Sequence, residues 1–187
     1  MKIVTIQDGC LYAVHYDEEE FDEYNRIFED HGSLPYVLDF FKANWLHIDQ
    51  YYVNILGWGR NETEAYAARV VEEALQLEEY FETLIDNTED GLTPDLHSHF
   101  ITLEGFEKEK NPAMKSYGLK RPSMLRVYAV EVEDKCLIIF YSGIKIGGAL
   151  SKCPILRDNV IKRAWRLVNY LKSENVETVD GVRKLAQ

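Results

Sequence analysis

Residues 136–141 read Cys-Leu-Ile-Ile-Phe-Tyr, and this uninterrupted apolar run decides the fold. A strand that is apolar on both faces is typical of the centre of a sheet, where other elements cover each face. The run lies within a longer strand-like segment, Lys135–Ser142, which follows another one, Leu125–Glu131, after the short link Val132-Glu133-Asp134. Two such segments with a short polar link between them predict a β-hairpin.

The residues after this hairpin predict the end of the β unit and a helix behind it. Gly143, Gly147 and Gly148 bracket a third short strand, expected around Ile144–Ile146. Pro154 then opens a closing helix, because proline suits the first helical turn. One face of this helix is apolar and consists of Leu156, Val160, Ile161, Ala164, Leu167, Val168 and Leu171.

The N-terminal residues predict a second hairpin. Lys2–Ile6 is rich in β-branched residues, and Cys10–Tyr16 continues with a period of two. Asp8-Gly9 between them is typical of a two-residue type I′ turn.

Three helices are predicted between the two hairpins. The acidic run Asp17–Glu20 favours the start of the first helix, which carries Phe21, Tyr24, Ile27 and Phe28 and should end at Gly32. Ser33 and Pro35 suit the start of the second, whose inward face carries Val37, Leu38, Phe41 and Trp45. Asn61 and Glu64 have the spacing of a capping box before the third. Its apolar stripe is the longest in the chain: Ala67, Val70, Val71, Ala74, Leu77, Phe81, Leu84 and Ile85.

The 187 residues therefore predict an α+β protein of one domain, with an antiparallel sheet and helices packed on one side of it. Its expected parts are a hairpin at 1–16, an acidic helical part at 17–95, a linker at 96–116, a basic β-hairpin/helix unit at 117–172 and a frayed tail at 173–187.

The charge is divided between the two halves of the chain. Residues 1–100 hold 22 Asp/Glu and 5 Lys/Arg, a net −17, whereas residues 101–187 hold 10 and 16, a net +6; together they give the total of −11. This division indicates that the back half meets something acidic, which is either a nucleic acid or the front half of the same protein. Uneven charge without any partner is the third interpretation.

The sequence predicts a cytoplasmic protein with no membrane association. The first apolar run, Lys2–Ile6, is too short for a signal peptide, and no stretch approaches the length of a membrane span. Cys10, Cys136 and Cys153 are far apart, and free, mostly buried thiols are expected.

Catalytic and metal-binding motifs give little guidance. His97 and His99 would face the same side of a strand, and Asp95 is the nearby candidate for a third zinc ligand, but exposed loop histidines are the simpler interpretation. The sequence has no G-x-S-x-G, HExxH, Walker or G-x-G-x-x-G motif. No metal and no cofactor is expected.

Basic residues interleaved with tyrosines are the more informative feature. Arg126 and Tyr128 share one face of their predicted strand, opposite Leu125, Val127 and Ala129. Basic side chains with aromatic ones on a sheet face can hold phosphates and stack bases. The further basic residues near this unit are Lys120, Arg121, Lys145, Lys152 and Arg163. In the alternative interpretation, these tyrosines and arginines stack on each other and pair with acids of the front half.

Residues 115–172 contain Met124-Leu-Arg126-Val-Tyr128-Ala-Val130, then the buried strand, then Gly143-Ile-Lys145, followed by the closing helix. This order of motifs resembles the RelE/ParE/HigB toxin superfamily. It implies a RelE-like core that carries a helical insertion. Toxins of this superfamily cleave mRNA on the ribosome or inhibit gyrase, and a cognate antitoxin holds them inactive.

The resemblance implies that Arg126 and Lys145 are the phosphate-facing pair. With Tyr128 they are the expected catalytic residues of a metal-independent endoribonuclease. The basic residues Lys120, Arg121, Lys152 and Arg163 are expected to bind the nucleic acid. RNA, the ribosome and an antitoxin would be the partners. The acidic front half would cover the basic face as a built-in substitute for an antitoxin. The alternative functions are a non-catalytic protein-interaction module of the same fold and a metal-dependent hydrolase built on His97 and His99.

Overall fold

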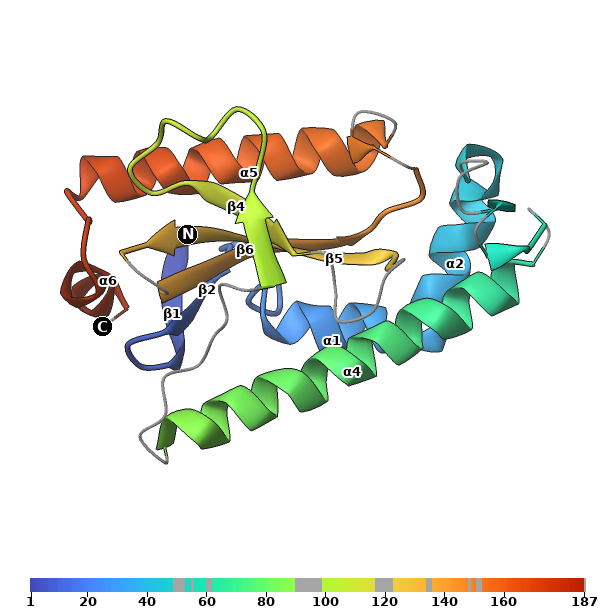
Figure 1. The fold of residues 1–187 in the computed structure, drawn as a ribbon, viewed down its shortest axis with the longest axis horizontal. Coiled ribbons are helices and arrows are strands. Elements are labelled where there is room, and N and C mark those ends of the chain that lie inside the picture. The colour runs from blue at the N-terminus through green and yellow to red at the C-terminus, as the bar shows by residue number, and fades with distance from the viewer. Residues whose placement is uncertain are drawn as a thin grey trace.

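A six-stranded mixed sheet forms the middle of the protein (Figure 1). The computed structural model describes residues 1–48, 53–54, 56–59, 62–89, 99–116, 123–133, 136–147, 149–150 and 153–186, with backbone alone at 88–89 and 154–155. The strand order is β1-β2-β6-β5-β4-β3. The strands are β1 (Lys2–Gln7), β2 (Leu11–His15), β3 (Phe100–Thr102), β4 (Ala113–Ser116), β5 (Leu125–Val132) and β6 (Cys136–Ile144). β2 and β6 pair in parallel, and the other neighbouring strands are antiparallel.

The central hairpin is confirmed, and its second strand is longer than the sequence suggested. β5 and β6 are the two middle strands of the sheet, and Arg126 pairs with Gly143 as Leu125 pairs with Ile144. Gly143 and Ile144 therefore end β6, and the separate strand predicted around Ile144–Ile146 is wrong. A Cβ on Gly143 would lie 2.6 Å from Cδ1 of Leu156, so glycine here lets α5 pack closely on the strand.

The N-terminal hairpin is also confirmed, but its turn differs from the prediction. The amide of Cys10 donates to the carbonyl of Gln7, and Gly9 has a φ of 83°. A type I′ turn needs a positive φ at both central residues, and Asp8 does not have one. The turn fits type II, in which only the second central residue requires positive φ.

Helices cover both faces of the sheet, so the prediction of an antiparallel sheet with helices on one side is wrong (Figure 1). α5 lies on one face, and α1 and α4 lie on the other. The helices are α1 (Asn25–His31), α2 (Leu34–Asn44), the 3-10 turn η1 (Trp45–His47), α4 (Thr63–Glu89), α5 (Pro154–Ser173) and α6 (Val179–Leu185). Helices lie on both faces of the sheet because β5 and β6 are apolar on both faces, and each face must be covered.

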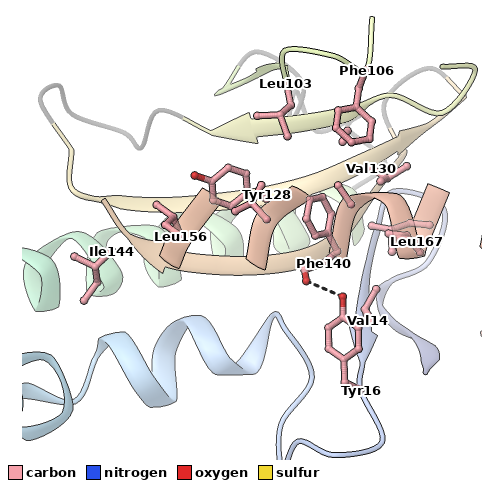
Figure 2. Packing of buried hydrophobic residues seen from close by; sticks show 14 of the residues in the cluster. Val14, Tyr16, Leu103, Phe106, Tyr128, Val130, Phe140, Ile144, Leu156 and Leu167 are labelled. Carbon is pink, nitrogen blue, oxygen red and sulfur yellow. Dashed lines mark hydrogen bonds between the residues drawn. The ribbon is translucent and has the colours of Figure 1, made fainter. Parts of the chain in front are cut away.

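Alternate side chains of β5 pack against the helices on opposite faces of the sheet. Leu125, Val127 and Ala129 belong to the core beneath α1 and α4, which includes Ala74, Leu77 and Phe81 of α4. Tyr128 and Val130 belong to the larger core beneath α5. Figure 2 shows Tyr128, Phe140 and Leu167 in this larger core, with the hydroxyl of Tyr16 donating to the Phe140 carbonyl at 3.1 Å.

The first two helices follow the predicted pattern with shifted starts. α1 begins only at Asn25, because the carboxylate of Asp22 accepts hydrogen bonds from the amides of Tyr24 and Asn25 at 2.9 and 3.0 Å. The acidic run therefore precedes the helix instead of forming its first turn. α2 begins after Ser33 as predicted, but Trp45 is 41% exposed and lies in η1.

The long helix and the closing helix are confirmed as α4 and α5. Two other segments differ from the expected linker and tail. Residues 96–116 contain β3 and β4, which extend the sheet beyond β5. The tail contains α6, in which Val182 is buried and Arg183 forms an ion pair with Asp8 at 2.8 Å. Short strands and a seven-residue helix are too brief for a clear periodicity.

Several predictions concern residues that the structure does not describe. They include the capping residue Asn61, Gly148, Asp95 and His97. The basic residues Lys120, Arg121 and Lys152 also lie outside the described residues.

Candidate nucleic-acid interface

A pocket of about 430 Å³ lies beside β4, β5 and the start of α5, and we call it the basic pocket. It contains Arg126, Tyr128 and Lys145, the three residues nominated as catalytic from the sequence. Its lining consists of Leu103, Glu104, Lys115, Arg126, Tyr128, Lys145, Ala149, Leu150, Arg157 and Ile161. Side chains as far apart in the chain as Leu103 and Ile161 thus meet at one place.

The sheet positions most of these groups. Arg126 and Tyr128 point to the same face of β5, and Lys115 of β4 is the register partner of Tyr128. Lys145 follows β6 directly, and its amide donates to the carbonyl of Met124 at 2.8 Å. Arg157 comes from α5, so the pocket joins the sheet to the helix that covers it.

Positive charge dominates the basic pocket. Lys115, Arg126, Lys145 and Arg157 are cationic, whereas Glu104 is the one carboxylate among the lining residues that the structure describes. Arg157 is exposed and forms an ion pair with Asp158 at 2.8 Å, which water and salt weaken. This excess of cations suits a ligand with negative charge.

The cations differ in depth. Arg126 is only 7% exposed, and its guanidinium donates to the carbonyl of Leu125 at 2.9 Å. Tyr128 is 1% exposed. Lys115 and Lys145 are half-buried, and Arg157 lies at the rim. A phosphate entering the pocket would therefore meet the more exposed cations first and the buried guanidinium of Arg126 last.

Arg163, which the sequence nominated for nucleic-acid binding, is not in the basic pocket. Its guanidinium forms ion pairs with Glu19 and Glu23. It also lies over the rings of Tyr16 and Tyr141, at 4.3 and 4.9 Å from their centroids. These contacts match the alternative interpretation of the sequence. In that interpretation, arginines stack on tyrosines and pair with acids of the front half.

Arg163 belongs to a group that we call the ion cluster, made of Glu19, Glu23, Arg26 and Arg163. Arg26 lies 3.0 Å from Glu23 and 3.5 Å from Glu19. Glu23 is fully buried, and burial raises its pKa to about 8 against the opposing effect of the two guanidiniums. The sequence analysis missed Glu23 and Arg26, whose spacing of three residues was the available signal.

Within the described residues the front half does not cover the basic pocket, although its Glu19 and Glu23 pair with Arg163 of the back half. Every described residue that lines the basic pocket comes from Leu103 or later in the chain. The helices α1 and α4 instead cover the opposite face of the sheet, over Leu125, Val127 and Ala129. Removing residues 17–95 would therefore expose a core, not a site.

Asp95 and His97 of the possible zinc site lie outside the described residues. Among the described residues, no group of three or more His, Cys, Asp or Glu side chains is placed to hold a metal ion. His99 packs edge-on against the ring of Tyr80, with 4.8 Å between centroids. All three cysteines are free, and Cys136 and Cys153 are buried.

Comparisons of the chain with protein-family models, curated proteins and solved structures found no match. Within the part of the chain that the structure describes, every helix is too short or too polar to cross a bilayer.

Proposed function

We propose that this protein acts on RNA, free or within the ribosome, as the toxin-like member of a toxin–antitoxin pair. The basic pocket would hold the phosphates of the RNA. One observation carries the proposal: Arg126, Tyr128 and Lys145, nominated from the sequence, line a single pocket together with Lys115 and Arg157.

The side chains of the basic pocket suit a phosphodiester. A guanidinium such as that of Arg126 can donate two parallel hydrogen bonds to phosphate oxygens, whereas Lys115 and Lys145 act as compact point charges. The buried position of Arg126 lowers the local dielectric and strengthens its attraction to an anion. Tyr128 adds an aromatic ring and a hydroxyl beside these cations.

The same groups can support cleavage without a metal. In that reaction the 2′-oxygen of a ribose bonds to the adjacent phosphorus, its proton leaves, and the bond to the 5′-oxygen breaks as that oxygen gains a proton. Negative charge accumulates on the phosphoryl oxygens in the transition state, where Arg126 and Lys145 would stabilise it. Tyr128 would orient the 2′-hydroxyl.

A matched pair of variants tests the proposal. Lys145→Ala with Arg157→Ala removes two cations of the basic pocket, and Lys162→Ala removes an exposed cation elsewhere on α5. We expect induced expression of the wild type to arrest growth and the purified protein to bind ribosomes or single-stranded RNA. The double variant should lose both effects, whereas Lys162→Ala should keep them. Equal binding by all three proteins would refute the proposal.

A second candidate function is a protein-interaction module without catalysis. The observation that favours it is a group of exposed apolar side chains on α2 and η1: Leu34, Tyr36, Trp45 and Leu46 are 41–61% exposed. Exposed apolar side chains concentrated on one segment suit contact with another protein. If Leu46→Ala with Trp45→Ala abolishes growth arrest while Lys145→Ala with Arg157→Ala does not, this second function is the correct one.

A further inference from the structure

A second cavity, of about 240 Å³, lies at the end of β6, where α1, α2 and α5 meet it. We call it the aromatic cavity, because Tyr36, Phe40 and Tyr141 line it together with His31. It shares no described lining residue with the basic pocket. The proposed function does not use it.

Two buried polar side chains of the aromatic cavity lack a hydrogen bond of good geometry within the described part of the chain. His31 is 3% exposed, and no described residue forms a hydrogen bond of good geometry with either of its ring nitrogens. Ser142 is 1% exposed, and its hydroxyl also has no partner among the described residues. Buried polar groups without partners are rare, and each one calls for a ligand or a bound water.

The walls of the aromatic cavity favour a flat ligand. The rings of His31 and Tyr36 have centroids 6.0 Å apart and are inclined by 37°. These two rings therefore contact each other and leave no space between them. Aromatic rings prefer offset-stacked or edge-to-face contacts with other rings, so a planar molecule packs better than a branched one against the aromatic wall of Tyr36 and Phe40, which lie one helical turn apart on α2. Leu156 and Ile144 supply the apolar remainder of the walls.

The charges around the aromatic cavity are balanced. Arg26 lines it, but its guanidinium is already paired with Glu19 and Glu23 of the ion cluster. Burial and the guanidinium of Arg26 lower the pKa of His31 to about 3, against a smaller opposing effect of the Ser142 carbonyl. The imidazole is therefore neutral at physiological pH and presents one donor and one acceptor.

From these observations we infer that the aromatic cavity binds an uncharged planar heterocycle of nucleobase size. The ring edge of the ligand would exchange hydrogen bonds with His31 and Ser142, and one of its faces would contact Tyr36 and Phe40. The volume agrees with this size, because pockets for larger, drug-sized ligands begin at about 300 Å³. The free bases adenine, hypoxanthine, cytosine and uracil are suitable probes.

Titration calorimetry with these four bases tests the inference on the full chain. We expect at least one base to bind in a 1:1 ratio, and benzoate, an anionic ring of similar size, to bind more weakly than that base. Ser142→Ala removes one hydrogen-bonding group and should weaken binding about tenfold, which is the usual effect of one such bond. Thermal unfolding confirms that this variant is folded.

Two variants on the surface of α2 provide a test that does not depend on the buried core. Tyr36→Ala removes a wall of the aromatic cavity, and Leu34→Ala changes a side chain of the same helix that does not line it; both residues are 45% exposed. Tyr36→Ala should weaken binding about tenfold and Leu34→Ala should not change it. Lys145→Ala, in the basic pocket, should also leave base binding unchanged, which separates this inference from the proposed function.

Three outcomes would overturn the inference. The first is that none of the four bases binds at concentrations up to about 1 mM, the level of very weak affinity, so that the aromatic cavity holds water alone. The second is that benzoate binds more tightly than every base. The third is that Ser142→Ala and Tyr36→Ala both bind the bases as the wild type does.

Discussion

The carboxylate of Glu73, on α4, accepts a hydrogen bond of 2.8 Å from the backbone amide of Leu125, the first residue of β5. The same oxygen accepts hydrogen bonds from the amide of Met124 and the hydroxyl of Ser123, at 2.8 and 2.9 Å. Burial raises the pKa of Glu73, and these donors oppose that change. One acidic side chain of the front half therefore fixes the start of the central strand of the back half.

We expect Glu73→Ala to lower the free energy of unfolding by about 3 kcal/mol. The substitution leaves two amides without an acceptor where Met124 and Leu125 are buried, and such groups are costly. Glu73→Gln keeps an acceptor oxygen and should cost about 1 kcal/mol. Urea unfolding measures both values. Glu79→Ala, an exposed position on the same helix, is the control, and an equal loss there would contradict the role of Glu73.

The ion cluster makes a second prediction. Arg163→Ala leaves the fully buried Glu23 with one guanidinium in place of two, and breaking a buried pair in this way costs about 3–5 kcal/mol. Arg166→Ala, on the same helix, loses only the exposed contact of 3.6 Å with Glu18 and should cost less than about 1 kcal/mol. Thermal or urea unfolding compares the two variants. Similar losses in both would show that the ion cluster adds no particular stability.

The burial of neutral His31 predicts a pH dependence. Its pKa is about 3 in the folded protein against 6.5 in the unfolded chain, so unfolding takes up a proton below pH 6.5. This contribution to stability is complete above pH 6.5 and is lost as the pH falls toward 3. Between about pH 7 and pH 5.5, the wild type should lose more stability than His31→Phe, which takes up no proton. Parallel unfolding curves for the two proteins across this range would argue against a neutral buried His31.

The proposed function predicts a particular dependence on salt. Each phosphate held by a cation contributes about −0.7 to the slope of log binding constant against log salt concentration for single-stranded RNA. Lys145→Ala with Arg157→Ala should therefore reduce the magnitude of this slope by about 1.4. Fluorescence anisotropy at several salt concentrations measures it. Lys162→Ala should keep the slope of the wild type, and a reduced slope there would indicate diffuse attraction instead of contacts in the basic pocket.

The C-terminal helix α6 should contribute to stability, although the sequence suggested a frayed tail. Val182 is fully buried, and replacing it with alanine removes two methyl groups from the core, which costs about 2 kcal/mol. Thermal unfolding of Val182→Ala measures this loss. Lys184→Ala, two positions further on at an exposed site, should unfold like the wild type. If Val182→Ala also unfolds at the temperature of the wild type, α6 is not part of the folded core.

The sequence predicted the elements that have a strong period of their own. The apolar run at 136–141 and the stripe along α4 are long enough for the strand and the helix to be predicted locally. The alternation along β5 placed Arg126 and Tyr128 on one face correctly. By contrast, β3, β4 and α6 are short, and they are stabilised by contacts with neighbours that are remote in the chain.

What the sequence determined by itself is therefore local: the hairpin of β5 and β6, the long helices, and the face of the strand to which Arg126 and Tyr128 point. Only the tertiary structure decided that Lys115 and Arg157 lie with them in the basic pocket. It also decided that Arg163 lies outside this pocket and pairs with Glu23, which is 140 positions away in the chain. The physical reason is that periodicity along one element sets which side chains share a face. The partner of a charged side chain across the fold depends on how separate elements pack, and that packing follows from burial of the whole core.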